Sequence, residues 1–119
     1  NILENIALGV DMFDCVMPTR NARTGTLFTW NGIINIKNKK WEHDFSPLDP
    51  AGSAEVDKMY SKSYVRHLIR ADELLAMYIT SVHNLAFYID LVKEARKHIK
   101  AGDFVEWKNK MVKQVSQKI

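Results

Sequence analysis

The sequence predicts an α/β piece with a β-hairpin followed by a helical subdomain, so that the 119-residue chain as a whole is α+β and mostly helical. Three observations predict this arrangement. A short apolar run follows a glycine near the N-terminus, an Asn-Gly pair separates two strand-like runs, and apolar residues recur at helical spacing from about Asp57 onward. The pattern changes near Pro50, which divides the chain into residues 1–48 and 49–119.

The first elements follow the rhythm of an α/β unit. Residues Ile2 to Leu8 predict the end of a helix, and Gly9 predicts its C-terminal stop, because glycine readily adopts the left-handed conformation that ends helices. Val10 to Val16 is a short apolar run interrupted by Asp11 and Asp14, which predicts a buried strand. Asp14 then falls near the C-terminal end of that strand, the end that carries catalytic groups in parallel α/β barrels.

A loop and a hairpin come next. Pro18 to Gly25 is polar and is predicted to be a loop. Leu27 to Trp30 and Ile33 to Ile36 flank Asn31-Gly32, a pair that accepts the positive φ angles of a type I′ turn, so these residues predict a hairpin. Asn38 to Pro50, with two prolines, predicts a second loop.

The remainder is predicted to be helical, in the pieces Met59 to Arg70, Asp72 to Tyr78 and Ser81 to Lys100, with Gly102 as a stop and Asp103 as the cap of a last helix. The buried stripes predicted for the two final helices are Leu85, Tyr88, Val92, Ala95 and Ile99, and then Phe104, Trp107, Met111 and Val115. Stripes of this kind are typical of a core and not of a cofactor site.

Composition narrows the class of protein. Hydrophobic residues make up 46% and charged residues 26%, which excludes a disordered tail or a fibre. No apolar run approaches the length of a membrane span, so we expect no membrane partner. A single cysteine, Cys15, excludes an internal disulfide and fits a reducing, cytoplasmic location. The chain opens in mid-helix without a signal-peptide pattern, and we therefore expect a fragment.

Positive charge is clustered although the formal net charge is only +3. Five basic residues and no acidic residue lie between Cys15 and Trp41, and eight basic residues against three acidic ones follow from Lys93. Such clusters suit a phosphate backbone. On charge alone, a solvated lysine-rich surface is the better interpretation.

One stretch is far more specific than composition. Residues 9–25 read GVDMFDCVMPTRNARTG, and this stretch resembles the active-site segment of bacterial tRNA-guanine transglycosylases. The resemblance covers the chain in order, through LFTWNG at 27–32, IKN at 36–38, PLDP at 47–50, YSKSY at 60–64 and HNLAFY at 83–88.

The resemblance implies a fold and an activity. That family has a (β/α)₈ TIM barrel with a helical insertion toward its C-terminus, and it exchanges the wobble guanine of certain tRNAs for a 7-deazaguanine base on the route to queuosine. Residues 1–48 would then hold the last barrel strand or strands, the active-site loop and the hairpin, and residues 49–119 the C-terminal helical subdomain. The implied partners are the tRNA anticodon loop, a guanine or 7-deazaguanine base, and a second copy in a homodimer.

The resemblance also implies roles for single residues. Asp14 matches the family's nucleophile, and a carboxylate suits that role because it stabilises the positive charge that develops on the anomeric carbon and can bond to it. Arg20 and Arg23 match positions used on the anticodon loop, where guanidinium groups suit phosphates and uracil edges. Without the resemblance, an aspartate at a strand end is more often a turn or cap residue, and two loop arginines have no fixed partner. Asp11 and Cys15 are interpreted as structural, with Cys15 packed on the other face of the strand.

The sequence departs from the family at a metal site. Most bacterial members carry a structural zinc bound by Cys-x-Cys-x₂-Cys and a distant histidine, and the matching positions here are Gly52, Ala54, Asp57 and His83. Structural zinc needs four good ligands, so we predict no zinc and no other cofactor. His83 is expected to hydrogen-bond Asp57 or to cap the helix near Ser81.

Length sets the last limit. A complete barrel of this kind runs to about 250 residues, and the family's general base and base-recognition groups would lie upstream, so the isolated chain is predicted to be inactive. Two alternatives stay open: a non-catalytic RNA-binding or partner subunit of the same fold, and a helical interaction module with a disordered leader. The intact FDC triplet around Asp14 argues against the first, and the MFDCVMPTRNAR segment argues against the second.

Overall fold

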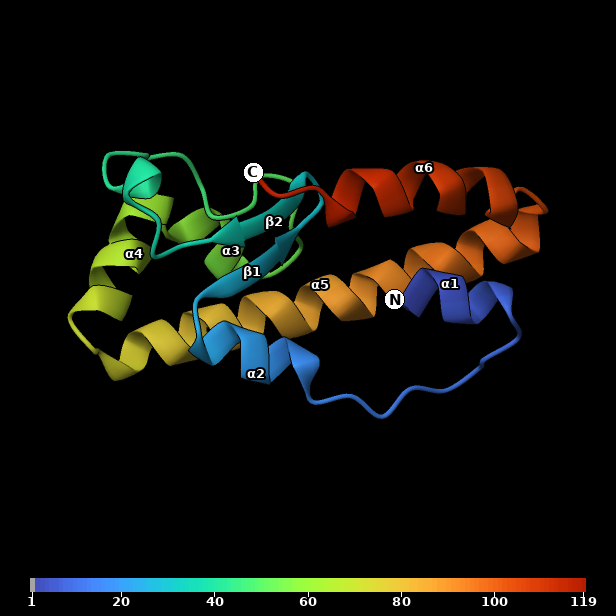
Figure 1. Cartoon of the computed structure of the whole chain (residues 1–119), viewed down its shortest axis with the longest axis horizontal. Coiled ribbons are helices and arrows are strands. Elements are labelled where there is room, and N and C mark those ends of the chain that lie inside the picture. Colours follow the sequence, from blue (N-terminus) through green and yellow to red (C-terminus); the bar gives the residue numbers. More distant parts are fainter. Residues whose placement is uncertain (1) are drawn as a thin grey trace.

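The chain is organised along one long helix, α5 (Leu74–Ala101), which runs through almost the whole molecule in Figure 1. The computed structural model describes residues 2–119 and measures 45 × 25 × 22 Å. The other elements, in chain order, are α1 (Ile2–Ala7), α2 (Met17–Arg23), β1 (Thr26–Thr29), β2 (Gly32–Asn35), the 3₁₀ helix η1 (Lys39–Trp41), α3 (Glu55–Met59), α4 (Lys62–Arg70) and α6 (Phe104–Ser116).

Helix α5 joins two segments that were predicted to be separate helices. The hydroxyl of Thr80 donates to the carbonyl of Ala76 at 2.9 Å, so this polar residue is satisfied inside the helix and does not interrupt it. Gly102 ends α5 with φ +82°, as predicted. By length and composition α5 is apolar enough to cross a membrane, contrary to the expectation from the sequence. Core helices meet the same criterion, and the buried face of α5 belongs to the core.

The predicted apolar stripe on α5 is wrong in most of its members. Ala95 is buried and Tyr88 packs edge-on against Phe28 and Phe87, but Leu85 and Ile99 are 43% and 52% exposed and Val92 is only half-buried. The stripe failed because it counted apolar residues alone, whereas the inward face includes polar ones. The buried residues of α5 are Ala76, Ile79, Thr80, His83, Asn84, Phe87, Leu91 and Ala95.

Two clusters of apolar side chains form the core, one at each half of α5. The first joins the hairpin and η1 to α3, α4 and the N-terminal half of α5, and the second joins α1 and the C-terminal half of α5 to α6. The stripe predicted for α6 does face the core, since Phe104, Trp107, Met111 and Val115 all pack on the second cluster, although each is only partly buried. The first cluster draws on both sides of the division predicted near Pro50, whose assignment to a barrel and an insertion stays a prediction.

The β-hairpin is confirmed, but its turn lies one residue earlier than predicted. Thr29 pairs with Gly32, so the loop is Trp30-Asn31 and not Asn31-Gly32. Gly32 adopts φ +141°, and a side chain there would overlap the carbonyl oxygen of Gln117. The chain's last residues lie along β2 (Figure 1), and the amide of Ile33 donates to Gln117 O at 2.8 Å.

Two predictions for the N-terminal third are wrong. Residues 10–16 form no strand: within the described residues, the backbone groups of Asp11 to Cys15 make no hydrogen bond to another backbone group. A strand needs a neighbour, and the described chain supplies none here. The predicted polar loop is instead helix α2, because Pro18 stands in its first turn, where the missing N–H is no loss. Helix α1 and its stop at Gly9, with φ +99°, agree with the prediction.

The start of helix α6 also differs from the prediction. Asp103 occupies the N-cap position, but its side chain makes no cap hydrogen bond. Its carboxylate instead lies 2.9 Å from Nδ1 of His98, and the His98 ring stacks on Trp107 with centroids 4.7 Å apart. The contact therefore holds the end of α5 against α6 across the glycine turn.

Candidate functional site

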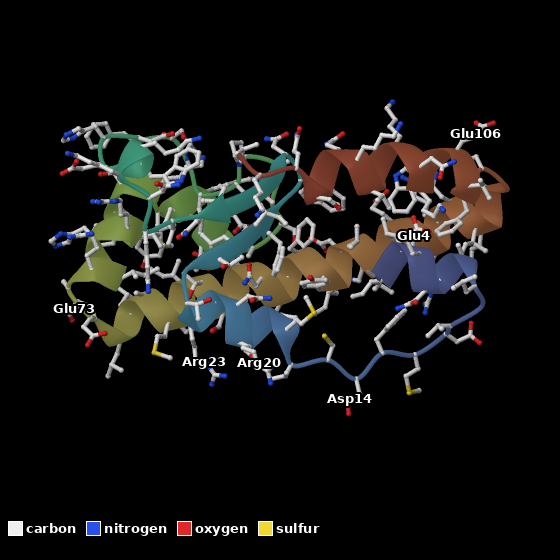
Figure 2. All side chains as sticks on the ribbon, viewed as in Figure 1. Glu4, Asp14, Arg20, Arg23, Glu73 and Glu106 are labelled. Atoms are coloured by element: carbon white, nitrogen blue, oxygen red, sulfur yellow. The ribbon has the colours of Figure 1, made fainter. Side chains whose placement is uncertain are left out.

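Asp14 lies in the extended segment between α1 and α2 and points outward from the edge of the molecule (Figure 2). Its side chain is exposed, and no other described residue is within ion-pair distance of it. An exposed carboxylate with no ion-pair partner has both its oxygens accessible. Chemically it can therefore act as a nucleophile or stabilise a cation that is brought to it.

Helix α2 begins directly after this segment and carries the two predicted arginines. Its buried residues are Pro18 and Ala22, which face α5, whereas Arg20 and Arg23 are exposed on the other side of the helix. Within residues 2–119 neither guanidinium makes a hydrogen bond or salt bridge. Asp14, Arg20 and Arg23 project from the same lower edge in Figure 2. The structure therefore gathers a free carboxylate and two free cations on one side of the chain.

Cys15 was interpreted as a packed residue, and this is wrong, because its thiol is exposed. Its sulfur accepts a hydrogen bond from the amide of Met17 at 3.4 Å, at the first turn of α2. The phenol of Tyr88 lies near it: burial raises the pKa of Tyr88 above its ordinary value, and the charge of a Cys15 thiolate would raise it further.

A groove of about 480 Å³ separates the Asp14 segment from α5. Met12, Phe13 and Cys15 line one side, and Ile89 and Val92 line the other. Met12 is 85% exposed and Ile89 is 54% exposed, so the walls are largely apolar surface open to solvent. Polar and charged side chains border the groove as well, namely Asp11 from the Asp14 segment and Tyr88, Lys93 and Arg96 from α5.

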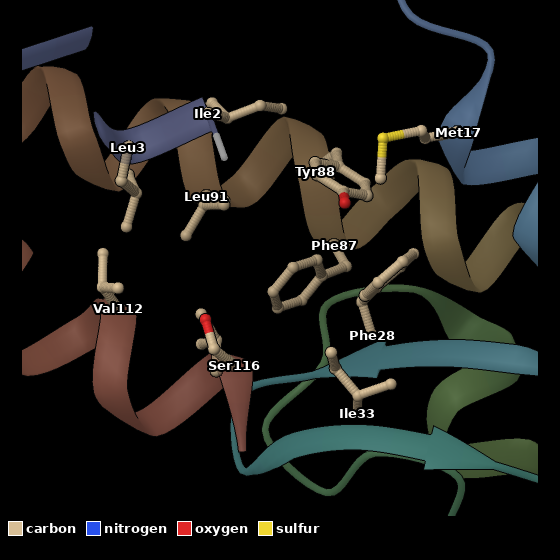
Figure 3. Close-up of a pocket in the computed structure, with 11 residues that line it drawn as sticks. Ile2, Leu3, Met17, Phe28, Ile33, Phe87, Tyr88, Leu91, Val112 and Ser116 are labelled. Carbon is tan, nitrogen blue, oxygen red and sulfur yellow. The ribbon is translucent and has the colours of Figure 1, made fainter. Parts of the chain in front are cut away.

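A second cavity, of about 200 Å³, lies inside the second core cluster (Figure 3). Phe28, Phe87, Leu91 and Val112 enclose it, together with Ser116 from the end of α6. The lining contains no charged group. This cavity is therefore a gap in core packing, not a site for a charged ligand.

The four positions implied as zinc ligands meet at one place. Asp57 Oδ1 hydrogen-bonds Nδ1 of His83, Asp57 Oδ2 accepts from the amide of Ala54 at 3.1 Å, and a side chain added at Gly52 would overlap the Asp57 carboxylate. Asp57 and His83 are 2% and 1% exposed. The predicted hydrogen bond between them is confirmed.

The residues present do not fit a structural zinc ion. Gly52 and Ala54 carry no donor atom, and the Asp57 carboxylate fills the space beside Gly52. His83 has no free nitrogen either, because its Nε2 donates to Phe28 O at 2.8 Å. Among residues 2–119 no three His, Cys, Asp or Glu side chains converge as a metal site would require.

Asn84, which sequence reasoning did not single out, is the most connected polar side chain near α2. It is fully buried, and its amide contacts α2 and strand β1. Asp49 completes the same edge of β1, since its Oδ2 accepts from Trp30 N at 3.2 Å. Together with His83, these side chains hydrogen-bond the outer edge of β1 as a neighbouring strand would. The sequence signal was a set of polar residues, Thr80, His83 and Asn84, at inward positions of the helix.

Comparison with known proteins gives consistent results. The family model described as queuine tRNA-ribosyltransferase matches residues 1–117. The queuine tRNA-ribosyltransferase of Aquifex aeolicus is 48% identical over 119 residues, which is 100% of this chain and 32% of that protein. That of Nitratidesulfovibrio vulgaris is 53% identical over 108 residues, or 91% of this chain and 29% of the relative. That of Helicobacter pylori strain HPAG1 is 48% identical over 118 residues, or 99% and 32%. The chain thus spans about a third of the length of the curated relatives it matches.

Proposed function

Because the chain belongs to the queuine tRNA-ribosyltransferase family, we propose that it is the C-terminal part of a tRNA-guanine transglycosylase, which exchanges the wobble guanine of tRNA for a 7-deazaguanine base. The observation that carries this proposal is Asp14, an exposed and unpaired carboxylate directly before a helix with two unpaired arginines. The intact FDC triplet around Asp14 argues against a non-catalytic partner subunit, which would not need a nucleophile.

The proposed reaction is a double displacement. A carboxylate oxygen of Asp14 bonds to the anomeric carbon of the target nucleotide as the bond from that carbon to guanine breaks, and guanine leaves with the electron pair and takes up a proton. The incoming base loses a proton, attacks the same carbon and releases the carboxylate. Two displacements restore the original stereochemistry, as in retaining glycosidases. The target base must leave its stack before this carbon can be reached.

Arg20 and Arg23 are proposed to bind the anticodon loop. Both guanidinium groups are exposed and unpaired within the described chain, on the same edge as Asp14. Planar guanidinium groups can pair with phosphate oxygens in two hydrogen bonds and can also contact base edges. The lysines of η1 and its flanks, Lys37, Lys39 and Lys40, add attraction for the RNA backbone.

Residues 10–16 are proposed to become a strand of a (β/α)₈ barrel when the upstream two-thirds of the protein are present. Their extended backbone has unpaired groups, and the groove beside them exposes apolar side chains, so neighbouring strands and helices would satisfy both. The general base and the base pocket would come from that upstream part. We therefore propose that the 119-residue chain alone is inactive, and that the full-length enzyme acts as a homodimer in the cytoplasm.

The helical subdomain is proposed to hold its shape without zinc. The Asp57–His83 pair takes the place of the metal by linking α3 to α5, and Nε2 of His83 extends the link to β1. Nothing in this arrangement leaves a thiolate or imidazole nitrogen available to a metal.

The nucleophile is tested with Asp14→Asn in the full-length enzyme, against Asp11→Asn as a matched control three residues earlier on the same exposed segment. Exchange of labelled guanine into tRNA should fall about a thousandfold or more for Asp14→Asn, because the amide cannot form the ester intermediate. Asp11→Asn should retain activity. Equal exchange rates for Asp14→Asn and wild type would refute the assignment.

A further inference from the structure

The side chain of Asn84 makes three hydrogen bonds to the backbone of two other segments. It is 0% exposed. Nδ2 donates to Pro18 O at 3.0 Å and to Thr26 O at 3.0 Å, and Oδ1 accepts from Phe28 N at 3.1 Å. A primary amide has two N–H donors, and both are used here, so the side chain has a single orientation in which all its contacts are satisfied.

These bonds join helix α2 to the hairpin through α5. Pro18 is in the first turn of α2, and Thr26 and Phe28 belong to β1. Within residues 2–119, Asn84 is the only side chain from another element that hydrogen-bonds the backbone of α2. His83, its neighbour, bonds Asp57 and Phe28 and does not reach α2.

Helix α2 packs closely along α5, and the bond from Asn84 adds a directional contact to that packing. The helix is seven residues long, and only Pro18 and Ala22 are buried, both of them small. Contacts between small residues fix the spacing of two helices but restrict rotation and sliding weakly. A directional hydrogen bond to Pro18 O restricts both. Arg20 and Arg23, on the opposite side of the helix, move with any rotation of it.

We propose that Asn84 is a positioning residue for tRNA binding: its amide fixes the rotation of α2, so that Arg20 and Arg23 face the same side of the molecule as Asp14. This inference rests on the proposed function, since it assumes that the two arginines bind RNA. Aspartate cannot substitute, because it offers an acceptor to Phe28 N but no donor to Pro18 O or Thr26 O.

The positioning is tested first on the 119-residue chain by amide hydrogen exchange. The variants are Asn84→Asp, which is nearly isosteric, and Asn84→Ser, which is milder and leaves room for a bridging water should Asn84→Asp fail to fold. The matched control is Thr80→Val, because Thr80 is equally buried one turn earlier but bonds only within α5. In both Asn84 variants we expect the amides of α2 to exchange about tenfold faster than in the wild type, while those of α6 change little. In Thr80→Val we expect no such selective change. Uniform acceleration of all helices would reduce Asn84 to a contributor to global stability and overturn the proposal.

The consequence for RNA is tested on the full-length enzyme by steady-state guanine exchange. In the Asn84 variants the KM for tRNA should rise about tenfold, the loss expected when one charged contact is weakened, with the KM for free guanine and the kcat nearly unchanged. A rise in both KM values, or an equal fall in kcat, would indicate general damage and overturn the proposal. Selective loosening of α2 with an unchanged KM for tRNA would also overturn it, while leaving the proposed function intact. A wild-type enzyme that exchanges no guanine would refute the proposed function itself.

Discussion

Replacing His83 with leucine tests whether the buried hydrogen-bonded pair Asp57–His83 stabilises the helical subdomain in place of a metal ion. The substitution leaves Asp57 Oδ1 without its partner and Phe28 O without its donor. Asp57 and His83 are 2% and 1% exposed in the native protein. Leaving a buried polar group without its partner costs about 1–3 kcal/mol, and more for a charged group, so the two lost hydrogen bonds together should cost roughly 3–5 kcal/mol. A domain of 119 residues has a free energy of unfolding of roughly 6–18 kcal/mol at 0.05–0.15 kcal/mol per residue. A large share of the stability should therefore be lost.

Urea denaturation measures this loss. With a slope of about 2 kcal/mol per molar urea, the midpoint should fall by roughly 2 M. The control is His67→Leu, since His67 is exposed on α4, and its midpoint should hardly change. The double variant Asp57→Ala/His83→Leu should lose less free energy of unfolding than the sum of the two single variants, because removing Asp57 also removes the carboxyl group that His83→Leu leaves without a partner. A single loss below about 1 kcal/mol, or strict additivity, would refute the account.

Three further predictions concern other parts of the chain. Gly32→Ala should lower the free energy of unfolding, measured by thermal denaturation, by about 1–3 kcal/mol, because φ is +141° and the carbonyl of Gln117 lies where the methyl group would go. Gly102→Ala is the control and should cost less, because Gly102 also has a positive φ but open space around it. A larger loss for Gly102→Ala would contradict the close approach at Gly32. Burial raises the pKa of Tyr88, so the folded state holds the phenol proton more tightly than the unfolded state does. The stability that this difference contributes is fully present below the unfolded pKa of about 10. It is lost as pH rises from there through the folded-state pKa. Tyr88→Phe should weaken the pH dependence of the urea midpoint between about pH 9 and 11. An unchanged pH dependence would contradict the contribution assigned to Tyr88. Elemental analysis of the purified chain should find no stoichiometric zinc, and a chelator should leave the urea midpoint unchanged; one zinc per chain would overturn the metal-free proposal.

The sequence was a good guide wherever local chemistry decides the structure. Gly9 and Gly102 end helices, as their conformational freedom predicts, and the hairpin lies where the Asn-Gly pair placed it to within one residue. The bond between Asp57 and His83 was also predicted. These features depend on residues whose backbone or side-chain requirements are visible in the sequence itself.

The failures share one cause, which is that the environment of a residue decides its structure. Val10 to Val16 reads as a strand, but a strand exists only beside another strand, and the described chain has none there. Pro18 was taken as part of a loop, although proline also suits the first turn of a helix. The inward face of α5 was missed because periodicity was sought among apolar residues, while Thr80, His83 and Asn84 are buried.

The roles of Asp14, Arg20 and Arg23 stay predictions, but their placement can be compared with the sequence analysis. Asp14, Arg20 and Arg23 were named from the sequence, and the structure places all three on one edge (Figure 2). The partners of Asn84 could not have been found from the sequence, because its bonds join residues 18, 26, 28 and 84, which only the folded chain brings together.

The way in which side chains close the outer edge of β1 bears on solubility. Open strand edges are templates for aggregation, and Asn84, His83 and Asp49 occupy the hydrogen-bonding groups that β1 would otherwise offer to another molecule. Residues 11–15 have no such cover: their backbone groups are extended and unbonded. Any self-association of the isolated chain through β-pairing should therefore start at the segment that carries Asp14 and leave the hairpin intact.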